Sequence, residues 1–167
     1  MPFDDHFKLT DDVISHLDTL IGGIADPFIT SRYIGFISVS AATVYELSIK
    51  DIFCEFGTKK HKVLGNFTQK YFDKINGRIK TSFIKDYIAA FGEKYVKRYR
   101  RKIEQKENEL LKTEKISMMA AYNNIIEWRN LFAHEGKIPA TVTYEEAIRS
   151  YNIGKEVIRC LAASMCR

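Results

Sequence analysis

Apolar residues recur at three- and four-residue steps along most of this chain, which is the period of an amphipathic helix. The clearest stripe is formed by Ala121, Ile125, Trp128 and Phe132. The alternation typical of a half-buried strand is missing, so we expect an all-α bundle of about five to seven helices. The predicted helices cover residues 11–24, 30–56, 66–75, 81–91, 93–112, a segment from Thr113 or Ser117 to about 134, and the stretch from 143 onward.

The length of 167 residues suits a single domain spanning residues 1–167. Residues 1–10 lack the helical period, and we expect them to form a flexible arm. Gly57 is predicted to end the long second helix. Thr143, followed by Glu146 three residues later, predicts a capping box at the start of the last helix.

Cysteines and hydropathy bear on location and metal binding. Cys54, Cys160 and Cys166 lack C-x-x-C spacing, so we interpret them as reduced thiols and expect no metal ion or cofactor. The longest uncharged run, residues 33–45, is too short to cross a bilayer. The start of the chain carries no basic and apolar leader pattern. We therefore expect a cytoplasmic protein without a membrane partner.

Positive charge is concentrated in the middle of the chain. Residues 58–117 hold 17 Lys and Arg against 7 Asp and Glu, whereas the remainder holds 9 against 14. This distribution fits either a solvated helix face or a surface that binds the phosphates of RNA. The candidate RNA-binding residues are Lys59, Lys60, Lys62, Arg98, Arg100 and Arg101.

The hexapeptide 129–134 carries the most suggestive chemistry. The chain has no Gly-rich phosphate loop, H-E-x-x-H or G-x-S-x-G pattern. Cleavage of RNA by its own 2′-hydroxyl needs neither a metal nor a protein nucleophile. It needs a group that transfers protons near neutral pH, such as His134, and a fixed cation for the phosphorane, such as Arg129. Asn130 lies one helical turn before His134 and could orient the imidazole.

One helix cannot easily aim both groups at the same atom. Arg129 and His134 are five residues apart, which separates them by about 140° around the helix axis. Two copies of the helix, packed about a two-fold axis, could bring both groups to a shared cleft. The alternative is structural: a histidine stabilised by the helix C-terminus and an arginine paired with Glu127 or Glu135.

Glu46 is a further candidate on the second predicted helix. It forms an i, i+4 pair with Lys50. Such a pair is either a surface ion pair of little energetic value or a charged pair beside a polar cleft.

The segment Arg129-Asn130-Leu131-Phe132-Ala133-His134 resembles the R-φ-x-x-x-H motif (φ polar) of the HEPN superfamily. The segments 91–95 (FGEKY) and 64–67 (LGNF) are similar to the RiboL-PSP-type HEPN branch, so the resemblance runs from about residue 33 onward. It implies a helical bundle that dimerises through the motif-bearing helices. It also implies a metal-independent endoribonuclease, often acting in toxin–antitoxin systems or anti-phage defence beside a partner protein.

The resemblance assigns Arg129 and His134 as the catalytic pair, Asn130 as the polar residue that tunes them, and Glu46 as an acidic group near the cleft. Because the family includes members that only bind, a second hypothesis is a non-catalytic HEPN module for RNA or a partner protein. A third is a helical adaptor in which the Arg/His spacing is accidental.

Overall fold

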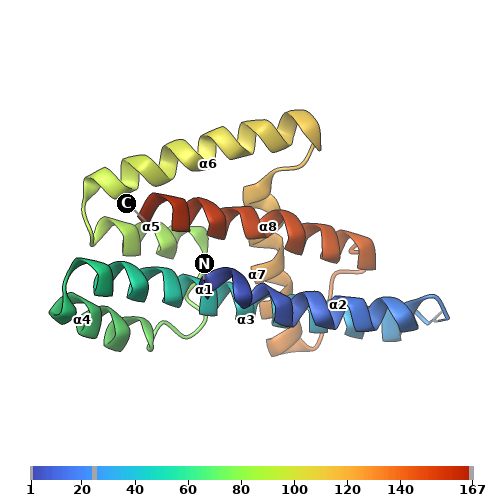
Figure 1. The fold of residues 1–167 in the computed structure, drawn as a ribbon. Helices are drawn as coiled ribbons and strands as arrows, with labels where there is room; N and C mark the ends of the chain where they lie inside the picture. The colour runs from blue at the N-terminus through green and yellow to red at the C-terminus, as the bar shows by residue number, and fades with distance from the viewer. Residues whose placement is uncertain (1, 24–25, 166–167) are drawn as a thin grey trace.

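The computed structural model describes residues 2–23 and 26–165, and all regular elements in them are helices. They are α1 (Pro2–Asp5), α2 (Phe7–Ile21), α3 (Pro27–Lys60), α4 (Lys62–Phe72), α5 (Thr81–Ala89), α6 (Glu93–Thr113), α7 (Met118–Glu135) and α8 (Tyr144–Met165) (Figure 1). Apart from the single turn α1, seven helices of nine or more residues build the described chain. The prediction of an all-α bundle of about five to seven helices is confirmed.

The long helix α3 is the centre of the bundle and packs against α2, α4, α7 and α8. It begins at Asp26, whose side chain accepts a hydrogen bond from Phe28 N at 2.8 Å, with Pro27 in the first turn. The prediction that Gly57 ends this helix is wrong, because α3 continues to Lys60. Gly57 is instead buried against Thr68, and its missing side chain lets α4 fold back closely onto α3.

The first residues are part of the core, so the prediction of a flexible arm over residues 1–10 is wrong for the described part of that segment. Phe3 and Phe7 are each 3% exposed, on α1 and α2. The Phe3 carbonyl accepts a hydrogen bond from Ser48 Oγ at 2.8 Å. His6 Nε2 lies 2.7 Å from Asp51 Oδ2. The arm prediction failed because two phenylalanines four positions apart are enough to bury this segment without a long periodic run.

Three buried tyrosines join α3, α7 and α8. The Tyr45 ring stacks on those of Tyr122 and Tyr151, with centroids 5.0 and 6.0 Å apart. The Tyr45 hydroxyl donates to the Tyr151 carbonyl at 2.7 Å. Burial raises the pKa of both Tyr45 and Tyr122 well above its ordinary value. These rings fix the position of α7, which crosses behind α3 and α8 in Figure 1.

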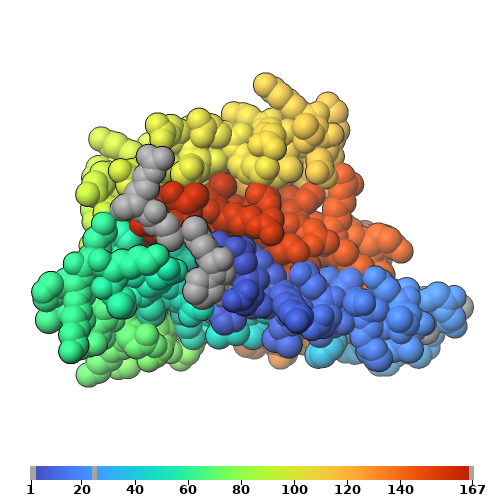
Figure 2. All heavy atoms as spheres, viewed as in Figure 1, coloured from blue at the N-terminus to red at the C-terminus, as the bar shows by residue number. Residues whose placement is uncertain are grey.

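The charged helix α6 forms an outer layer over α8, as Figure 2 shows. Its buried residues are Tyr95, Tyr99 and Leu110, which anchor the helix to the core. At the other end of the charged region, α4 begins earlier than predicted because His61 Nδ1 accepts a hydrogen bond from Val63 N at 3.2 Å.

Within residues 2–23 and 26–165, none of the helices is both long and apolar enough to cross a membrane.

Candidate active site

The motif helix α7 is fixed at both ends. Ser117 Oγ accepts a hydrogen bond from Ala120 N at 3.0 Å, and the Glu107 carboxylate of α6 accepts from Met118 N at 2.8 Å. A carboxylate at this position also interacts favourably with the positive end of the helix dipole. Gly136 ends the helix with φ +64°, and its N–H donates to the Phe132 carbonyl. The residues from 129 to 134 therefore lie in the last turns of a well-capped helix.

Arg129 is half-buried and its guanidinium is held in place on two sides. Nη1 donates to Asn130 Oδ1 at 2.9 Å. Nη2 lies against Gly77, so close that a Cβ added at Gly77 would be 2.6 Å from it. The sequence suggested that Asn130 orients His134, whereas the structure shows its side chain bonded to Arg129. Asn130 therefore directs the cation of the motif.

The loop that contacts Arg129 is also held by Glu46. Gly77 N donates to Glu46 Oε2 at 2.6 Å, and Glu46 Oε1 lies 2.8 Å from Lys50 Nζ. The side chains of Glu46 and Lys50 are only 20% and 21% exposed, so this is not a freely solvated surface pair. Glu46 and Arg129 thus lie against the same glycine from two different helices.

The loop of residues 73–80 is also held by hydrogen bonds from two tyrosine hydroxyls to its backbone. The Tyr122 hydroxyl donates to the Ile79 carbonyl at 2.7 Å, and the Tyr87 hydroxyl donates to the Arg78 carbonyl at 3.0 Å. Asn76 and Gly77 both have positive φ, 34° and 77°. The predicted helix over 66–75 ends just before Asn76-Gly77, and the sequence did not reveal the contact of Gly77 with Arg129. The dipeptide is a turn signal, but nothing in its pattern names the residue it will face.

His134 lies exposed near the C-terminal end of α7, and we find no hydrogen bond from it to any described residue. Five residues of helix place it about 7.5 Å further along the axis than Arg129 and about 140° around it. Within one copy, the described contacts of Arg129 lie with Asn130 and Gly77 and do not include His134.

A second arginine, which sequence reasoning missed, lies at the same end of α7. Arg32 Nη1 donates to the Gly136 carbonyl at 2.6 Å, and its guanidinium lies 4.4 and 5.7 Å from the Phe28 and Phe132 ring centres. Phe132 in turn packs on Gly35 of α3, where a Cβ would clash with its ring. These contacts hold the end of the motif helix on α3. They also place the Arg32 guanidinium at the carbonyl of Gly136, two residues after His134.

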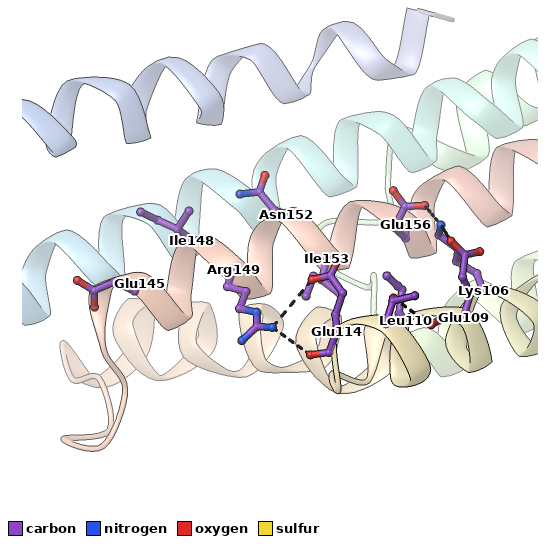
Figure 3. Close-up of a pocket in the computed structure, with 11 residues that line it drawn as sticks. Lys106, Glu109, Leu110, Glu114, Glu145, Ile148, Arg149, Asn152, Ile153 and Glu156 are labelled. Carbon is purple, nitrogen blue, oxygen red and sulfur yellow. Dashed lines mark hydrogen bonds and ion pairs between the residues drawn. The ribbon is translucent and has the colours of Figure 1, made fainter.

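A pocket of about 530 Å³ beside the motif is lined by Glu127, Asn130 and Leu131 of α7 and by residues 80–82, where α5 begins. A different pocket, between α6 and α8, is shown in Figure 3. There Arg149 Nη2 donates to the Glu114 carbonyl at 3.1 Å, and Lys106 pairs with Glu109 at 2.8 Å. Its lining has four carboxylates against two cations, so the pocket in Figure 3 suits a polyanion poorly.

The residues predicted to bind RNA lie on α3, α4 and α6, whereas Arg129 lies on α7. Lys59 pairs with Glu55 at 2.5 Å, and Lys60 lies 5.4 Å from the Phe56 ring centre. Lys62 starts α4, and Arg98 lies on α6, 5.7 Å from the Tyr95 ring centre. Exposed Arg100 and Arg101 follow on α6. These six residues do not line the pocket beside Asn130, and their role in RNA binding stays a prediction.

Nucleophilic and metal-binding groups are scarce near the motif. Burial raises the pKa of Cys54 and of Cys160 to about 11, so neither is a thiolate at neutral pH. Cys166 lies outside the described residues. Among the residues that the structure describes, we find no group of three or more His, Cys, Asp or Glu placed to hold a metal ion. What the site offers is a fixed guanidinium, an exposed imidazole and an amide.

Comparison with known proteins gives one match that spans nearly the whole chain. The family model described as RiboL-PSP-HEPN matches residues 4–167. No curated protein and no solved structure matches the chain.

Proposed function

Because this chain belongs to the RiboL-PSP-HEPN family, we propose that it is a metal-independent endoribonuclease in which Arg129 and His134 act on one scissile phosphate. HEPN proteins are commonly endoribonucleases. The observation that carries the proposal is the guanidinium of Arg129, which Asn130 and the Gly77 loop hold in one place while His134 stays exposed.

The reaction uses groups already present in RNA. The 2′-hydroxyl oxygen attacks the neighbouring phosphorus, and His134 accepts the hydroxyl proton. Arg129 stabilises the additional negative charge on the phosphorane oxygens. The bond to the 5′-oxygen then breaks, and that oxygen takes up the proton from the His134 imidazolium. The products are a 2′,3′-cyclic phosphate and a 5′-hydroxyl, and neither a metal nor a cofactor takes part.

The proposal includes a homodimer that joins the two motif helices. Within one copy, the axial and angular separation of Arg129 and His134 prevents both from reaching the same phosphate. The surface near the end of α7 favours association, because Phe28 and Phe36 of α3 are 63% and 52% exposed. Large apolar side chains left exposed along one helix can be covered by a second copy. Phe28 contacts Arg32, which binds the end of the motif helix.

The biological role that we propose is that of a toxin or anti-phage effector acting in the cytoplasm. This role fits a nuclease of this kind, because uncontrolled cleavage of cellular RNA arrests growth unless another protein restrains the enzyme. An antitoxin or defence-system partner is therefore part of the proposal, and co-expression of neighbouring gene products with the nuclease tests it.

A second candidate function is a non-catalytic HEPN module that binds RNA or a partner protein. The absence of any described hydrogen bond from His134 favours it, because catalytic histidines are usually oriented by a second group. In this reading the positive charge of residues 58–117 binds RNA without turnover.

Cleavage assays with two single substitutions separate the two functions. A nuclease loses cleavage in both Arg129→Ala and His134→Ala, while each variant keeps its helical content and its affinity for RNA. Mixing the two inactive variants provides a sharper test. If one copy supplies Arg129 and the other supplies His134, mixed dimers regain part of the activity. A wild-type protein that binds RNA but leaves it intact in the presence of a chelator establishes the binding module instead.

A further inference from the structure

We propose that the pocket between α4 and α5 holds an unstacked base of single-stranded RNA beside the cleavage site, an inference that rests on the proposed function. The α4–α5 pocket has a volume of about 510 Å³. Three aromatic side chains line it, Phe67 and Tyr71 of α4 and Phe83 of α5. Three cations line it as well, Lys70, Lys74 and Arg78.

The aromatic rings are unusually exposed for side chains of their size. Phe67, Tyr71 and Phe83 are 64%, 50% and 36% exposed. The rings of Phe67 and Tyr71 lie within 18° of parallel, with centroids 6.1 Å apart. Exposed aromatic faces provide a platform for the bases of a single strand, because every base has a π-face that can stack. In duplex RNA the bases are already stacked on each other, so the pocket selects single strands.

The platform is rigid before any ligand arrives. The Tyr71 ring makes T-shaped contacts with the rings of Phe72 and Tyr87, with centroids 5.1 and 6.3 Å apart. Phe72 is 2% exposed, and Tyr87 is itself tied to the loop through its bond to the Arg78 carbonyl. A side chain held in this way loses little conformational entropy when a base stacks on it.

The charges of the pocket favour a phosphate-bearing ligand. Lys70, Lys74 and Arg78 form no ion pair with a described acidic residue. Asp86 is the one carboxylate that lines the pocket, and it can accept a hydrogen bond from the amino group of a base. Over residues 62–86 the sequence has six Lys and Arg against two Asp. Cations beside exposed aromatic rings match a strand that presents phosphates and bases together.

The location of the pocket connects it to the proposed chemistry. Arg78 lines the α4–α5 pocket, whereas its neighbour Gly77 touches the guanidinium of Arg129. Continuing along the chain, Lys80 lines the pocket that also contains Asn130. The segment 77–80 thus separates a base-binding platform from the phosphate-binding end of the motif. A strand whose phosphate lies at Arg129 can place an adjacent base on Tyr71, which would set the position of the cut.

The experiment compares binding of strands that differ only in their bases. The probe is a short fluorescent 2′-O-methyl RNA, which has no free 2′-hydroxyl and is not cleaved, together with an abasic strand of equal length. The protein is the wild-type chain, the double variant Phe67→Leu/Tyr71→Leu, and the conservative variant Tyr71→Phe. Val63→Ala is the matched control, because Val63 is 68% exposed on α4 but does not line the pocket.

We expect the double leucine variant to bind the base-bearing strand roughly 5- to 150-fold more weakly, the range typical of stacking on one base. Its affinity for the abasic strand should equal that of the wild type. Tyr71→Phe and Val63→Ala should bind both strands normally. Unchanged affinity of the double variant for the base-bearing strand overturns the proposal, and so does an equal loss for both strands. Polyglutamate that competes with the RNA for the site containing Tyr71 also overturns the proposal, because the ligand would then be an acidic peptide.

The same proteins assayed for cleavage of ordinary RNA separate this inference from the proposed function. If the double leucine variant cleaves RNA as the wild type does and at the same position, the base-binding role of the pocket is contradicted but the nuclease function is not. If the wild-type protein binds the strands as described but does not cleave RNA, the nuclease function is contradicted but the base-binding role is not.

Discussion

The guanidinium of Arg129 lies against Gly77, and no side chain at position 77 fits between them. A Cβ at position 77 would lie 2.6 Å from Arg129 Nη2. Gly77 also has φ +77°, and its N–H donates to Glu46. The position of the proposed catalytic cation therefore depends on a glycine 52 residues away in sequence.

Gly77→Ala should impair RNA cleavage by roughly 10- to 100-fold, because a Cβ displaces the guanidinium and small misplacements of a catalytic group are costly. Gly92→Ala is the matched control. Gly92 also has positive φ, 115°, but nothing lies within 4 Å of its added Cβ. Both variants lose some stability from backbone strain, about 1 kcal/mol or more. Rates of cleavage that fall equally in the two variants would contradict the role assigned to Gly77.

Glu46→Ala should reduce both stability and cleavage, because Gly77 N loses its charged acceptor and the loop beside Arg129 becomes mobile. We expect a loss of roughly 1–3 kcal/mol in the free energy of unfolding. Glu46→Gln keeps an acceptor oxygen and should recover part of the activity. The control is Glu55→Ala on the same helix, whose pair with Lys59 is more exposed and is worth at most about 1 kcal/mol. If denaturant unfolding and cleavage kinetics give the same stability and the same rate for Glu46→Ala and Glu55→Ala, Glu46 does not position the loop beside Arg129.

Two buried tyrosines should respond in opposite ways to loss of the hydroxyl. Tyr99 Oη is buried and has no hydrogen-bond partner among the described residues, whereas Tyr45 Oη donates to the Tyr151 carbonyl. Tyr99→Phe should leave the free energy of unfolding unchanged or raise it by about 1 kcal/mol, and Tyr45→Phe should lower it by about 1 kcal/mol. Chemical denaturation of the two variants measures both effects, and a larger loss in Tyr99→Phe would contradict the assignment.

Stability should fall steeply at alkaline pH. Burial raises the pKa of Tyr45, Tyr99 and Tyr122 above the ordinary value of 10.0. Above pH 10 the unfolded chain therefore binds fewer protons than the native state, and the free energy of unfolding decreases as pH rises. Below pH 10 these groups contribute no pH dependence. Tyrosinate absorbance from the buried rings should appear together with loss of helical circular dichroism. Ionisation of all tyrosines near pH 10 with the helices intact would be the contrary result.

The fold was largely predictable because helical periodicity is local. The stripe of Ala121, Ile125 and Trp128 is buried as expected, and Thr143 Oγ1 accepts from Glu146 N at 3.1 Å as the capping box required. Errors arose where tertiary contacts override a local signal. Gly57 reads as a helix terminator but is required for the close packing of Thr68, and Phe3 and Phe7 pack in the core although their segment lacks a repeating pattern.

The site was predictable only in part. Asn130 and Glu46 were named as supporting residues from the motif and the family resemblance. In the structure Asn130 accepts a hydrogen bond from Arg129, and Glu46 binds Gly77, which lies against Arg129. Gly77 and Arg32 were not predicted, because contacts between segments far apart in sequence leave no periodic trace. The catalytic roles of Arg129 and His134 stay predictions from the motif.

The most direct test of the account is end-group analysis of RNA cut by the purified protein in the presence of a chelator. The account predicts fragments that end in a 2′,3′-cyclic phosphate or 3′-phosphate and begin with a 5′-hydroxyl. It also predicts that a 2′-deoxy substitution at the cleaved position, or His134→Ala in the protein, abolishes them. Fragments with a 3′-hydroxyl and a 5′-phosphate, or equal cleavage by His134→Ala, would contradict it.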